Sequence, residues 1–531
     1  MPMVDQDARN QIRSDLDCNM LVEAAAGTGK TSELVQRIIA VLTAGRASID
    51  QIVAVTFTEK AAGELKLRLR AELEKARSQS KASKRRPYLE DALAHLEEAR
   101  VSTIHAFCAD LLRERPVEAR IDPQFEVMTD VQSQNLYRQA FNLWFQRKLE
   151  DLPEGIRRFL RRRSREPVTE ALLKAGWELA NWRDFPTPWR REVFGRDQEI
   201  DRLVDNLHTF ADLTRNPGNP SNMLFLDTAP ARSFSDEIKT VSAIREKDYD
   251  ALEAMFVSLG KDREYDQFRK PHKGYAQYKK NVRGEDVFTA HTTLLALIQT
   301  FVQNANADLA PLLQTELTES VSEYQALKQR SGQLDFLDLL IRMCDLLVSS
   351  ADARSDFQNR YTHIFVDEFQ DTDPLQAEIL ILLSTDGAEV CDWRKLRPIP
   401  GKLFIVGDPK QAIYRFRRAD VGTYEEVKKL LLGQGARFLE LTTSFRSLPS
   451  IQCVVNESFS PEMDGSPEKL QARYVPLSPF RADYTKQPAV VALPVRAHTG
   501  SEGSRCKQWN HRCRTQSLLL WTGWSVRAAG P

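Results

Sequence analysis

The sequence has little cysteine, no excess of charge of either sign and no long apolar run. Its seven cysteines are odd in number and scattered over 531 residues, which is typical of the reducing cytosol rather than of a disulfide framework. No apolar run approaches the ~20 residues that a membrane span needs. Residues 1–17 are polar, carry acids and resemble neither a signal nor a transit peptide. We therefore expect a cytoplasmic protein without membrane contact.

The charge balance excludes little by itself. Lys+Arg and Asp+Glu number 74 each, so the net charge argues neither for nor against a nucleic-acid partner. Local clusters can still form a basic track on a neutral protein. One dense basic stretch is "IRRFLRRRSR" at 156–165. A solvated helix face explains this stretch somewhat better than a nucleic-acid contact does.

The stretch "VEAAAGTGKTSELV" (22–35) has the composition of a phosphate-binding loop. An apolar run precedes it and an apolar pattern at helical spacing follows it, which predicts the order strand, loop, helix. Gly27 and Gly29 allow backbone N–H groups to face anionic oxygens. Lys30 then reaches the β- and γ-phosphates, and the Thr31 hydroxyl holds magnesium. The predicted nucleotide-binding residues are Ala24, Ala25, Ala26, Gly27, Thr28, Gly29, Lys30 and Thr31.

An acidic pair supplies the other half of this predicted site. In "IFVDEFQDT" (364–372) an apolar strand ends in Asp367, which binds magnesium, and in Glu368, which orients and deprotonates the attacking water. Gln411 and Arg446 each follow another apolar strand and suit sensing of the γ-phosphate. The implied cofactors are ATP and Mg²⁺. The predicted catalytic residues are Glu368, Lys30, Gln411 and Arg446.

Strand and helix signals alternate in two separate blocks of the sequence. Apolar strand runs occupy 19–24, 51–58, 363–368, 402–409 and 437–446. Between about 117 and 330, long charged segments rich in Leu, Arg and Glu look helical and contain no such run. Alternating strands and helices predict a parallel sheet with both faces covered. The predicted fold class is α/β, one domain split by a helical insertion of about 200 residues.

Ordered motifs resemble those of superfamily 1 DNA helicases of the UvrD/Rep/RecB type. They are "AAAGTGKT" (24–31), "VTFTEKAAGEL" (55–65), "STIHAFC" (102–108), "LDFLDLL" (334–340), "VDEFQDT" (366–372), "GDPKQAIYRFRRAD" (407–420) and "TTSFRS" (442–447). The wording "DPKQAIYRFR" is similar to that of the RecB/AddA branch. The resemblance covers roughly 4–130 and 330–450. It implies a RecA-like phosphate-loop NTPase that uses ATP to move 3′ to 5′ on single-stranded DNA.

The resemblance also implies partners and places individual residues. The implied partners are single-stranded and duplex DNA and a RecC/AddB-like subunit, in DNA repair or recombination. Gln6 stands where the family has an adenine-reading glutamine, the alternative being a surface glutamine. Phe57 falls in a loop that faces single-stranded DNA in the family, unless it is a core residue at a strand end. His105 either touches DNA or caps a turn.

Aromatic and basic residues interleave in "YRFRR" at 414–418. In the family this loop also faces single-stranded DNA. Stacking on Tyr414 and Phe416 accepts any base, while cations such as Arg417 hold the backbone. This pattern favours a DNA motor over a signalling or assembly ATPase.

The motif positions divide the chain into predicted segments. These are a first RecA-like lobe in two parts (1–116 and 331–449), a helical accessory insertion (117–330), the start of a second RecA-like lobe (450–496) and an aberrant tail (497–531). The tail holds three of the eight tryptophans and two of the seven cysteines, and we expect it to be out of frame. Zinc binding by Cys506, His511 and Cys513 is the alternative, although their spacing fits no usual ligand pattern.

Two functions share this predicted chemistry. The first is an ATP-dependent 3′–5′ DNA helicase whose recorded chain is incomplete, because the later second-lobe motifs and a nuclease motif are absent. The alternative is an ATP- and DNA-binding lobe without helicase activity of its own. With its second lobe only begun, the 531-residue chain is expected to hydrolyse ATP poorly and to unwind nothing.

Overall fold

The computed structural model divides into two compact units. The sheet unit comprises Met1–Arg120 and Leu340–Pro531, and the helical unit comprises Ile121–Leu339. The structure describes residues 3–79, 85–163, 166–242, 247–273, 277–386, 392–413, 418–419, 421–465, 472–483 and 488–491. The predicted DNA contacts Tyr414, Phe416 and Arg417 lie outside the described residues, as does the predicted tail, 497–531.

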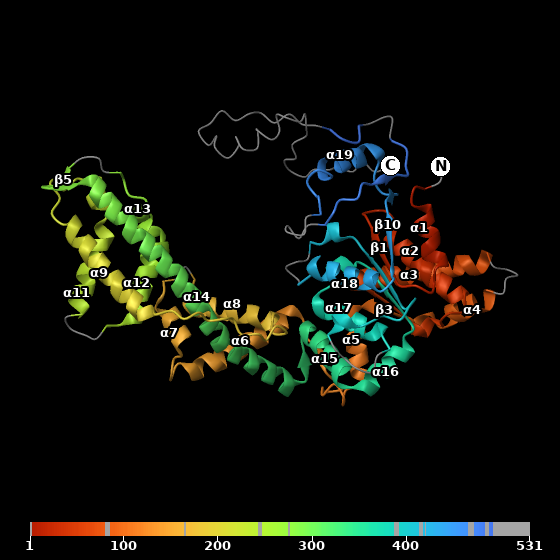
Figure 1. Cartoon of the computed structure of the whole chain (residues 1–531). Helices are drawn as coiled ribbons and strands as arrows, with labels where there is room; N and C mark the ends of the chain where they lie inside the picture. The colour runs from red at the N-terminus through yellow and green to blue at the C-terminus, as the bar shows by residue number, and fades with distance from the viewer. Residues whose placement is uncertain are drawn as a thin grey trace. The chain divides into compact units, whose positions relative to one another are not determined.

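A six-stranded parallel sheet forms the centre of the sheet unit (Figure 1). Its strands are β1 (Met20–Ala24), β2 (Ile52–Thr56), β3 (Arg100–Thr103), β8 (His363–Val366), β9 (Leu403–Gly407) and β10 (Arg437–Leu441). They are ordered β10-β1-β9-β8-β2-β3, and every neighbouring pair is parallel. Strands from before and after the helical unit therefore share one sheet. The predicted α/β, RecA-like fold is confirmed.

The strands are apolar because helices cover the sheet. β1, β2 and β9 are buried at every position. Side chains such as Val22 and Ala54 form one core with α2 (Lys30–Thr43) and α3 (Glu59–Gln79). The other helices of this unit are α1 (Gln6–Ser14), α4 (Arg86–Ala94), α5 (Ile104–Glu114), α16 (Ala351–Arg360), α17 (Pro374–Ser384), α18 (Val421–Gly433) and α19 (Pro449–Phe459). Helix α15 (Phe336–Ser349) begins in the helical unit and continues into the sheet unit.

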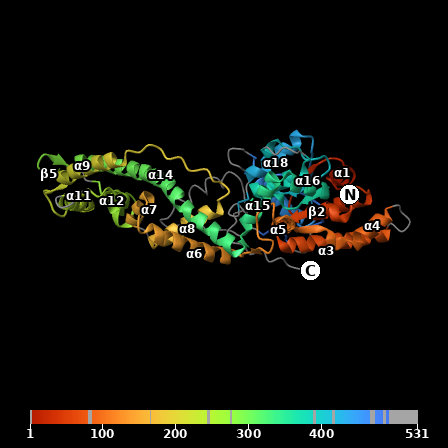
Figure 2. The same ribbon diagram turned by 90° about the horizontal axis from the view of Figure 1, so that it is seen from below.

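One long helix organises the helical unit. Helix α14 (Gly284–Ser331) has 48 residues and so extends for about 70 Å, running the length of this unit in Figure 2. Two apolar cores line it, one around Phe301 and one around Tyr324. The remaining helices are α6 (Asp130–Lys148), α7 (Glu154–Arg161), α8 (Val168–Asn181), α9 (Arg196–Thr214), α10 (Met223–Asp227), α11 (Ala229–Ser242), α12 (Tyr249–Lys261) and α13 (Asp266–Arg269). Among the described residues, no helix combines the length and apolarity needed to span a bilayer.

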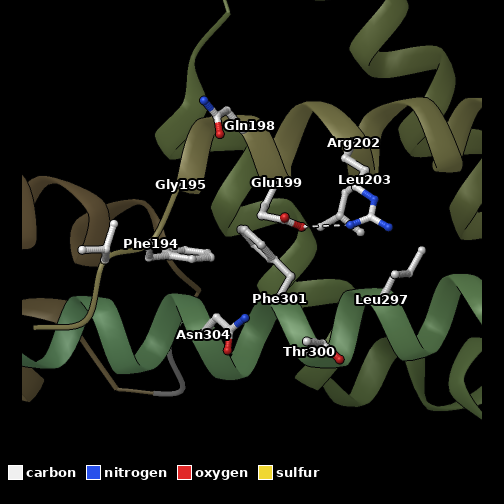
Figure 3. Close-up of a pocket in the computed structure, with 11 residues that line it drawn as sticks. Phe194, Gly195, Gln198, Glu199, Arg202, Leu203, Leu297, Thr300, Phe301 and Asn304 are labelled. Carbon is white, nitrogen blue, oxygen red and sulfur yellow. Dashed lines mark ion pairs between the residues drawn. The ribbon is translucent and has the colours of Figure 1, made fainter.

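The helical unit also carries a groove of about 420 Å³ between α9 and α14. Figure 3 shows Phe194, from the segment before α9, and Phe301, from α14, among its lining residues. Glu199 and Arg202 form a 3.9 Å ion pair at its rim. Its lining is part aromatic and part polar, without the glycine-rich backbone that cradles phosphates.

The basic stretch 156–165 differs from the expected solvated face. Arg158 is fully buried, and its guanidinium lies 2.8 Å from Glu253 and 2.7 Å from Asp308. Arg157 pairs with Asp250 on α12 at 2.5 Å. The expectation is wrong at Arg158, because acids on α12 and α14 take up the charge of α7 inside the unit. These ion pairs also weaken the case for phosphate contacts by this stretch.

Candidate ATP site

The phosphate loop lies between β1 and α2, where the sheet strands end at their carboxyl edge. Gly27 and Gly29 have φ angles of +76° and +88°, a region that residues with a side chain rarely adopt. A Cβ at Gly27 would also overlap the Cβ of Arg446. Helix α2 begins at Lys30, so the free N–H groups of its first turn face the loop. Backbone conformation and packing therefore both require glycine here.

The structure brings the two predicted halves of the site together. Lys30 Nζ lies 2.8 Å from Glu368 Oε2, and Thr31 Oγ1 donates to Asp367 Oδ2 at 3.0 Å. The Asp367 N–H donates to Val55 O of the neighbouring strand β2 at 2.9 Å. Parallel strands end at the same edge of a sheet, so the loop after β1 and the acids after β8 meet there. Four predicted residues form one constellation.

The ATP site contains more carboxylates than cations, because Asp367, Glu368 and Asp371 face the single ammonium of Lys30. Asp367 is 7% exposed, and burial together with the Glu368 charge raises its pKa to about 6. The same two causes raise the pKa of Asp371 to about 6. Lys30 forms an ion pair with Glu368, and its charge lowers the pKa of Asp367 and Asp371 less than burial and the Glu368 charge raise it. The residues fit Mg²⁺, which takes oxygen ligands, with Asp367 and Thr31 as the groups that would hold it.

The substitution Asp367→Asn is expected to stabilise the metal-free protein. A raised pKa in the folded state means that this group contributes stability below its ordinary pKa of 3.8 and loses it as pH rises through about 6. The asparagine side chain carries no charge, so the variant should be more stable than the wild type by about 1–2 kcal/mol near pH 7.5. Urea unfolding in chelator measures the difference, which should shrink near pH 5. A variant less stable than the wild type at both pH values would contradict the assigned excess of carboxylates.

Arg446, the predicted sensor, lies beside the phosphate loop. It follows β11 (Thr443–Ser444), and its side chain is exposed. The Phe445 N–H donates to Gly27 O at 2.8 Å, which fixes this segment against the loop. The Phe445 ring also lies 3.7 Å from the position of a Cβ on Gly29. The sequence motif did not single out Phe445, and the γ-phosphate role of Arg446 remains a prediction.

The two predicted glutamines are hydrogen-bonded within their own segments. Gln411 ends a short 3₁₀ helix after β9, and its Nε2 donates to Asp408 Oδ2 at 2.6 Å. Gln6 opens helix α1 and donates from Nε2 to Asn10 Oδ1 at 2.9 Å. Sensing of the γ-phosphate by Gln411 and reading of adenine by Gln6 both remain predictions.

Two buried charged residues at α1, Asp5 and Arg9, support the phosphate loop and were missed in the sequence, and Arg9 contacts the loop directly. Arg9 donates to Thr28 O at 2.9 Å and to Glu33 Oε1 at 3.0 Å. Asp5 accepts hydrogen bonds from Arg9 and from the N–H and hydroxyl of Thr443. The loop carbonyl and the Thr443 segment are thus held by one ion pair. The only sign of this ion pair in the sequence is the spacing of Asp5 and Arg9, four residues apart. Pairs at that spacing usually lie on the surface of a helix, so the spacing does not indicate burial.

Replacing Arg9 by alanine is expected to destabilise the protein and to weaken ATP binding. The change leaves Asp5 without its cation partner and releases the Thr28 carbonyl, at a cost of about 3–5 kcal/mol. Arg13→Ala is the matched control, because Arg13 pairs with the same Glu33 from a side chain that is 43% exposed. That control should lose no more than about 1 kcal/mol. Urea unfolding and ATP titration of both variants check this, and equal losses would refute the role of Arg9.

The structure places two predicted DNA contacts at the carboxyl edge of the sheet. Phe57 follows β2 directly and is half-buried. His105 lies in the first turn of α5, where burial lowers its pKa to about 4, so it is uncharged near neutral pH. Thr103, rather than His105, caps this turn by accepting from the Ala106 N–H at 3.2 Å. A DNA role for Phe57 and His105 stays a prediction, and His105 would act there as a neutral group.

A glycine-rich loop between a buried strand and a helix, facing an Asp–Glu pair on a parallel sheet, defines a phosphate-loop NTPase of the RecA-like class. The model of the UvrD/REP helicase N-terminal domain matches residues 4–431. The chain belongs to the UvrD/REP helicase family.

Curated relatives carry names of the RecB/AddA branch. A relative from Syntrophomonas wolfei, named as a subunit of an ATP-dependent helicase/nuclease, is 29% identical over 482 residues, which cover 83% of this chain and 36% of the relative. The protein of the same name from Ligilactobacillus salivarius is 25% identical over 492 residues, covering 83% and 38%. The exonuclease/helicase protein RexA of Lactococcus lactis, also named as a subunit, is 26% identical over 487 residues, covering 84% and 39%. The chain thus spans less than two fifths of the length of these relatives.

Proposed function

We propose that this protein is an ATP-dependent DNA helicase that moves 3′ to 5′ on single-stranded DNA, in DNA repair or recombination. The observation that carries the proposal is the contact of Lys30 and Thr31 with Glu368 and Asp367 in a UvrD/REP family chain. Lys30 and the first turn of α2 bind the phosphates of ATP. Glu368, whose side chain is 33% exposed, orients the attacking water and takes its proton. Magnesium held by Asp367 and Thr31 would supply positive charge at the phosphates.

The arrangement of the other predicted residues supports coupling to DNA. Arg446 lies on a segment bonded to the phosphate loop, so its cation can reach the charge that develops on the γ-phosphate. Phe57 and His105 follow β2 and β3 at the same edge of the sheet, where a strand of DNA would lie next to the ATP site. The relatives are named as subunits, and we propose a RecC/AddB-like partner subunit for the present protein.

A second candidate applies to this chain taken alone. The six-stranded sheet of the described residues carries the ATP-site residues, and Phe57 and His105 follow two of its strands, which supports a lobe that binds ATP and DNA. Duplexes with a single-stranded 3′ or 5′ tail, incubated with ATP and Mg²⁺, distinguish the two. Unwinding of the 3′-tailed duplex alone supports the helicase, and unwinding of the 5′-tailed duplex refutes the polarity. ATP and DNA binding without unwinding supports the second candidate.

Phe416→Ala is expected to weaken binding to single-stranded DNA by about 1–3 kcal/mol, because one base loses its stacking partner. Fluorescence anisotropy with a labelled oligonucleotide measures the effect. Tyr88→Ala is the matched control: Tyr88 is 50% exposed and contacts Gly45 after the last turn of α2, away from the carboxyl edge of the sheet. An affinity equal to that of the wild type in both variants would remove Phe416 from the DNA surface.

A further inference from the structure

The side chain of Gln370 lies between the ATP site and the segment that follows β9. It is 3% exposed. Its Nε2 donates to Glu368 Oε2 at 2.7 Å, and its Oε1 accepts from the Asp408 N–H at 2.8 Å. Both ends of one amide are therefore engaged, one with the carboxylate of Glu368 and the other with the backbone beyond a different strand.

Hydrogen bonds continue from both ends of this amide. Glu368 Oε2 also lies 2.8 Å from Lys30 Nζ of the phosphate loop. The carboxylate of Asp408 accepts from Gln411 Nε2 at 2.6 Å. Lys30, Glu368, Gln370, Asp408 and Gln411 thus form an unbroken path from the phosphate loop to the 3₁₀ helix after β9.

The backbone around Gln370 leaves space for this arrangement. A Cβ at Gly407, the last residue of β9, would lie 3.1 Å from Gln370 Oε1 and 3.4 Å from its backbone nitrogen. The first distance is tighter than ordinary van der Waals contact, and the second is at its lower limit. Glycine at this strand end therefore allows the amide to reach the Asp408 N–H. Glu368 itself has a φ of +54°, so the acidic segment turns sharply just before Gln370.

A neutral donor on Glu368 has a chemical consequence. When ATP draws Lys30 toward its phosphates, the Glu368 carboxylate loses the cation that it contacts here. The Gln370 amide then remains to hold the carboxylate in place. It orients the carboxylate as a neutral donor and adds no second positive charge beside it.

We propose that Gln370 is a positioning residue that holds Glu368 for attack by water and links that carboxylate to the 408–411 segment. The inference rests on the proposed ATPase function and deepens it. Gln370 touches neither phosphate nor water in this role. It acts through Glu368 on one side and through Asp408 on the other.

Two substitutions test the two hydrogen bonds of the Gln370 side chain, one to Glu368 and one from the Asp408 N–H. Gln370→Met removes both bonds in a side chain of similar length. Gln370→Glu keeps an acceptor for the Asp408 N–H but faces Glu368 with a second carboxylate. Gln358→Met is the matched control in the same unit, because Gln358 is 8% exposed and donates from Nε2 to Leu382 O at 2.7 Å. It tests the loss of a buried glutamine away from the ATP site.

The experiment uses the full chain with Mg²⁺ and compares turnover with binding. For Gln370→Met, kcat of ATP hydrolysis should fall about 10²-fold, while the Kd of a non-hydrolysable ATP analogue stays within about twofold. Gln370→Glu should lose at least as much. Gln358→Met should keep both values even where its melting temperature falls. Wild-type kcat in Gln370→Met, or parallel losses of kcat and analogue affinity, would overturn the inference.

A double-mutant cycle tests the link to the 408–411 segment. The effects of Gln370→Met and Gln411→Ala on kcat should be clearly less than additive, because both interrupt the same path. Additive effects would overturn that link. The ATP analogue should also change the affinity for oligo(dT) by a smaller factor in Gln370→Met than in the wild type. This measurement uses binding alone and needs no ATP hydrolysis. A wild-type chain with neither hydrolysis nor linkage refutes the proposed function and the inference together. An active wild type with an unaffected Gln370→Met refutes only the role of Gln370.

Discussion

Replacing Lys30 by alanine is expected to reduce ATP hydrolysis by at least about 10³-fold, because the phosphates lose the cation that binds them and stabilises the developing charge. Lys30 is 8% exposed and contacts Glu368 at 2.8 Å. Glu368 keeps the hydrogen bond from Gln370 in the variant, so the fold should persist. Release of phosphate and titration with ATP measure the change directly.

A control makes the loss at Lys30 specific. Lys66→Ala removes a lysine on α3 that pairs with Glu97, whose side chain is 77% exposed. That variant should hydrolyse ATP like the wild type, since exposed ion pairs contribute little to stability. Unchanged hydrolysis in Lys30→Ala would remove the phosphate-loop assignment, whatever the control does.

Replacing Arg158 by methionine is expected to destabilise the protein strongly. Its guanidinium contacts Glu253, Asp308 and Glu154, and its side chain is fully buried. Methionine removes the one fully buried cation of this cluster, although Glu253 keeps Arg162 and Arg196 and Asp308 keeps Arg191. Breaking buried ion pairs in this way costs about 3 kcal/mol. The loss should appear in the helical unit, because that ion-pair cluster lies entirely within it.

Tryptophan fluorescence during urea unfolding reports on this loss. The helical unit contains Trp144, Trp177, Trp182 and Trp189, and the other described tryptophan is Trp393 of the sheet unit. Arg161→Met is the control, because Arg161 is 57% exposed and pairs with Asp248 at 3.3 Å. It should lose less than about 1 kcal/mol. Equal stability of the Arg158 and Arg161 variants would contradict a stabilising role for the buried ion pairs of Arg158 with Glu253 and Asp308.

The local geometry of the ATP site was predictable from its motif. Gly27, Gly29 and Lys30 are set by one short stretch, because positive φ angles and a helix start occur within a few residues. Asp367 and Glu368 follow an apolar run directly, so their position at a strand end also follows from local sequence. The order of the strands has no such local signal, since β9 and β10 reach β1 through pairings distant in sequence.

The strand predicted for 437–446 is shorter in the structure, because a residue distant in sequence binds the backbone where the apolar run would continue the strand. The structure ends β10 at Leu441. The carboxylate of Asp5 accepts from the N–H groups of Thr442 and Thr443 and so takes donors that would otherwise extend the sheet. An apolar run cannot reveal that a distant acid will bind its backbone. The segment that carries Arg446 is therefore a bend after the short strand β11, beside the phosphate loop, rather than a continuation of β10.

Buried charges were the main features that sequence patterns could not reveal. Arg9 and Arg158 both lie on helices with charged neighbours, so their positions look like solvated faces. Their burial depends on acids from distant segments, Glu33 for Arg9 and Glu253 for Arg158. Gln370 is hidden for the same reason, because its partner at Asp408 comes from a different strand end.

Steady-state ATP hydrolysis, measured with and without single-stranded DNA, tests the central claim most directly. The account predicts Mg²⁺-dependent turnover that rises when oligo(dT) is added and is lost in Lys30→Ala. Slow turnover with this DNA response would agree with a nucleotide site coupled to a DNA surface. Turnover that ignores DNA, or that persists in Lys30→Ala, would contradict it.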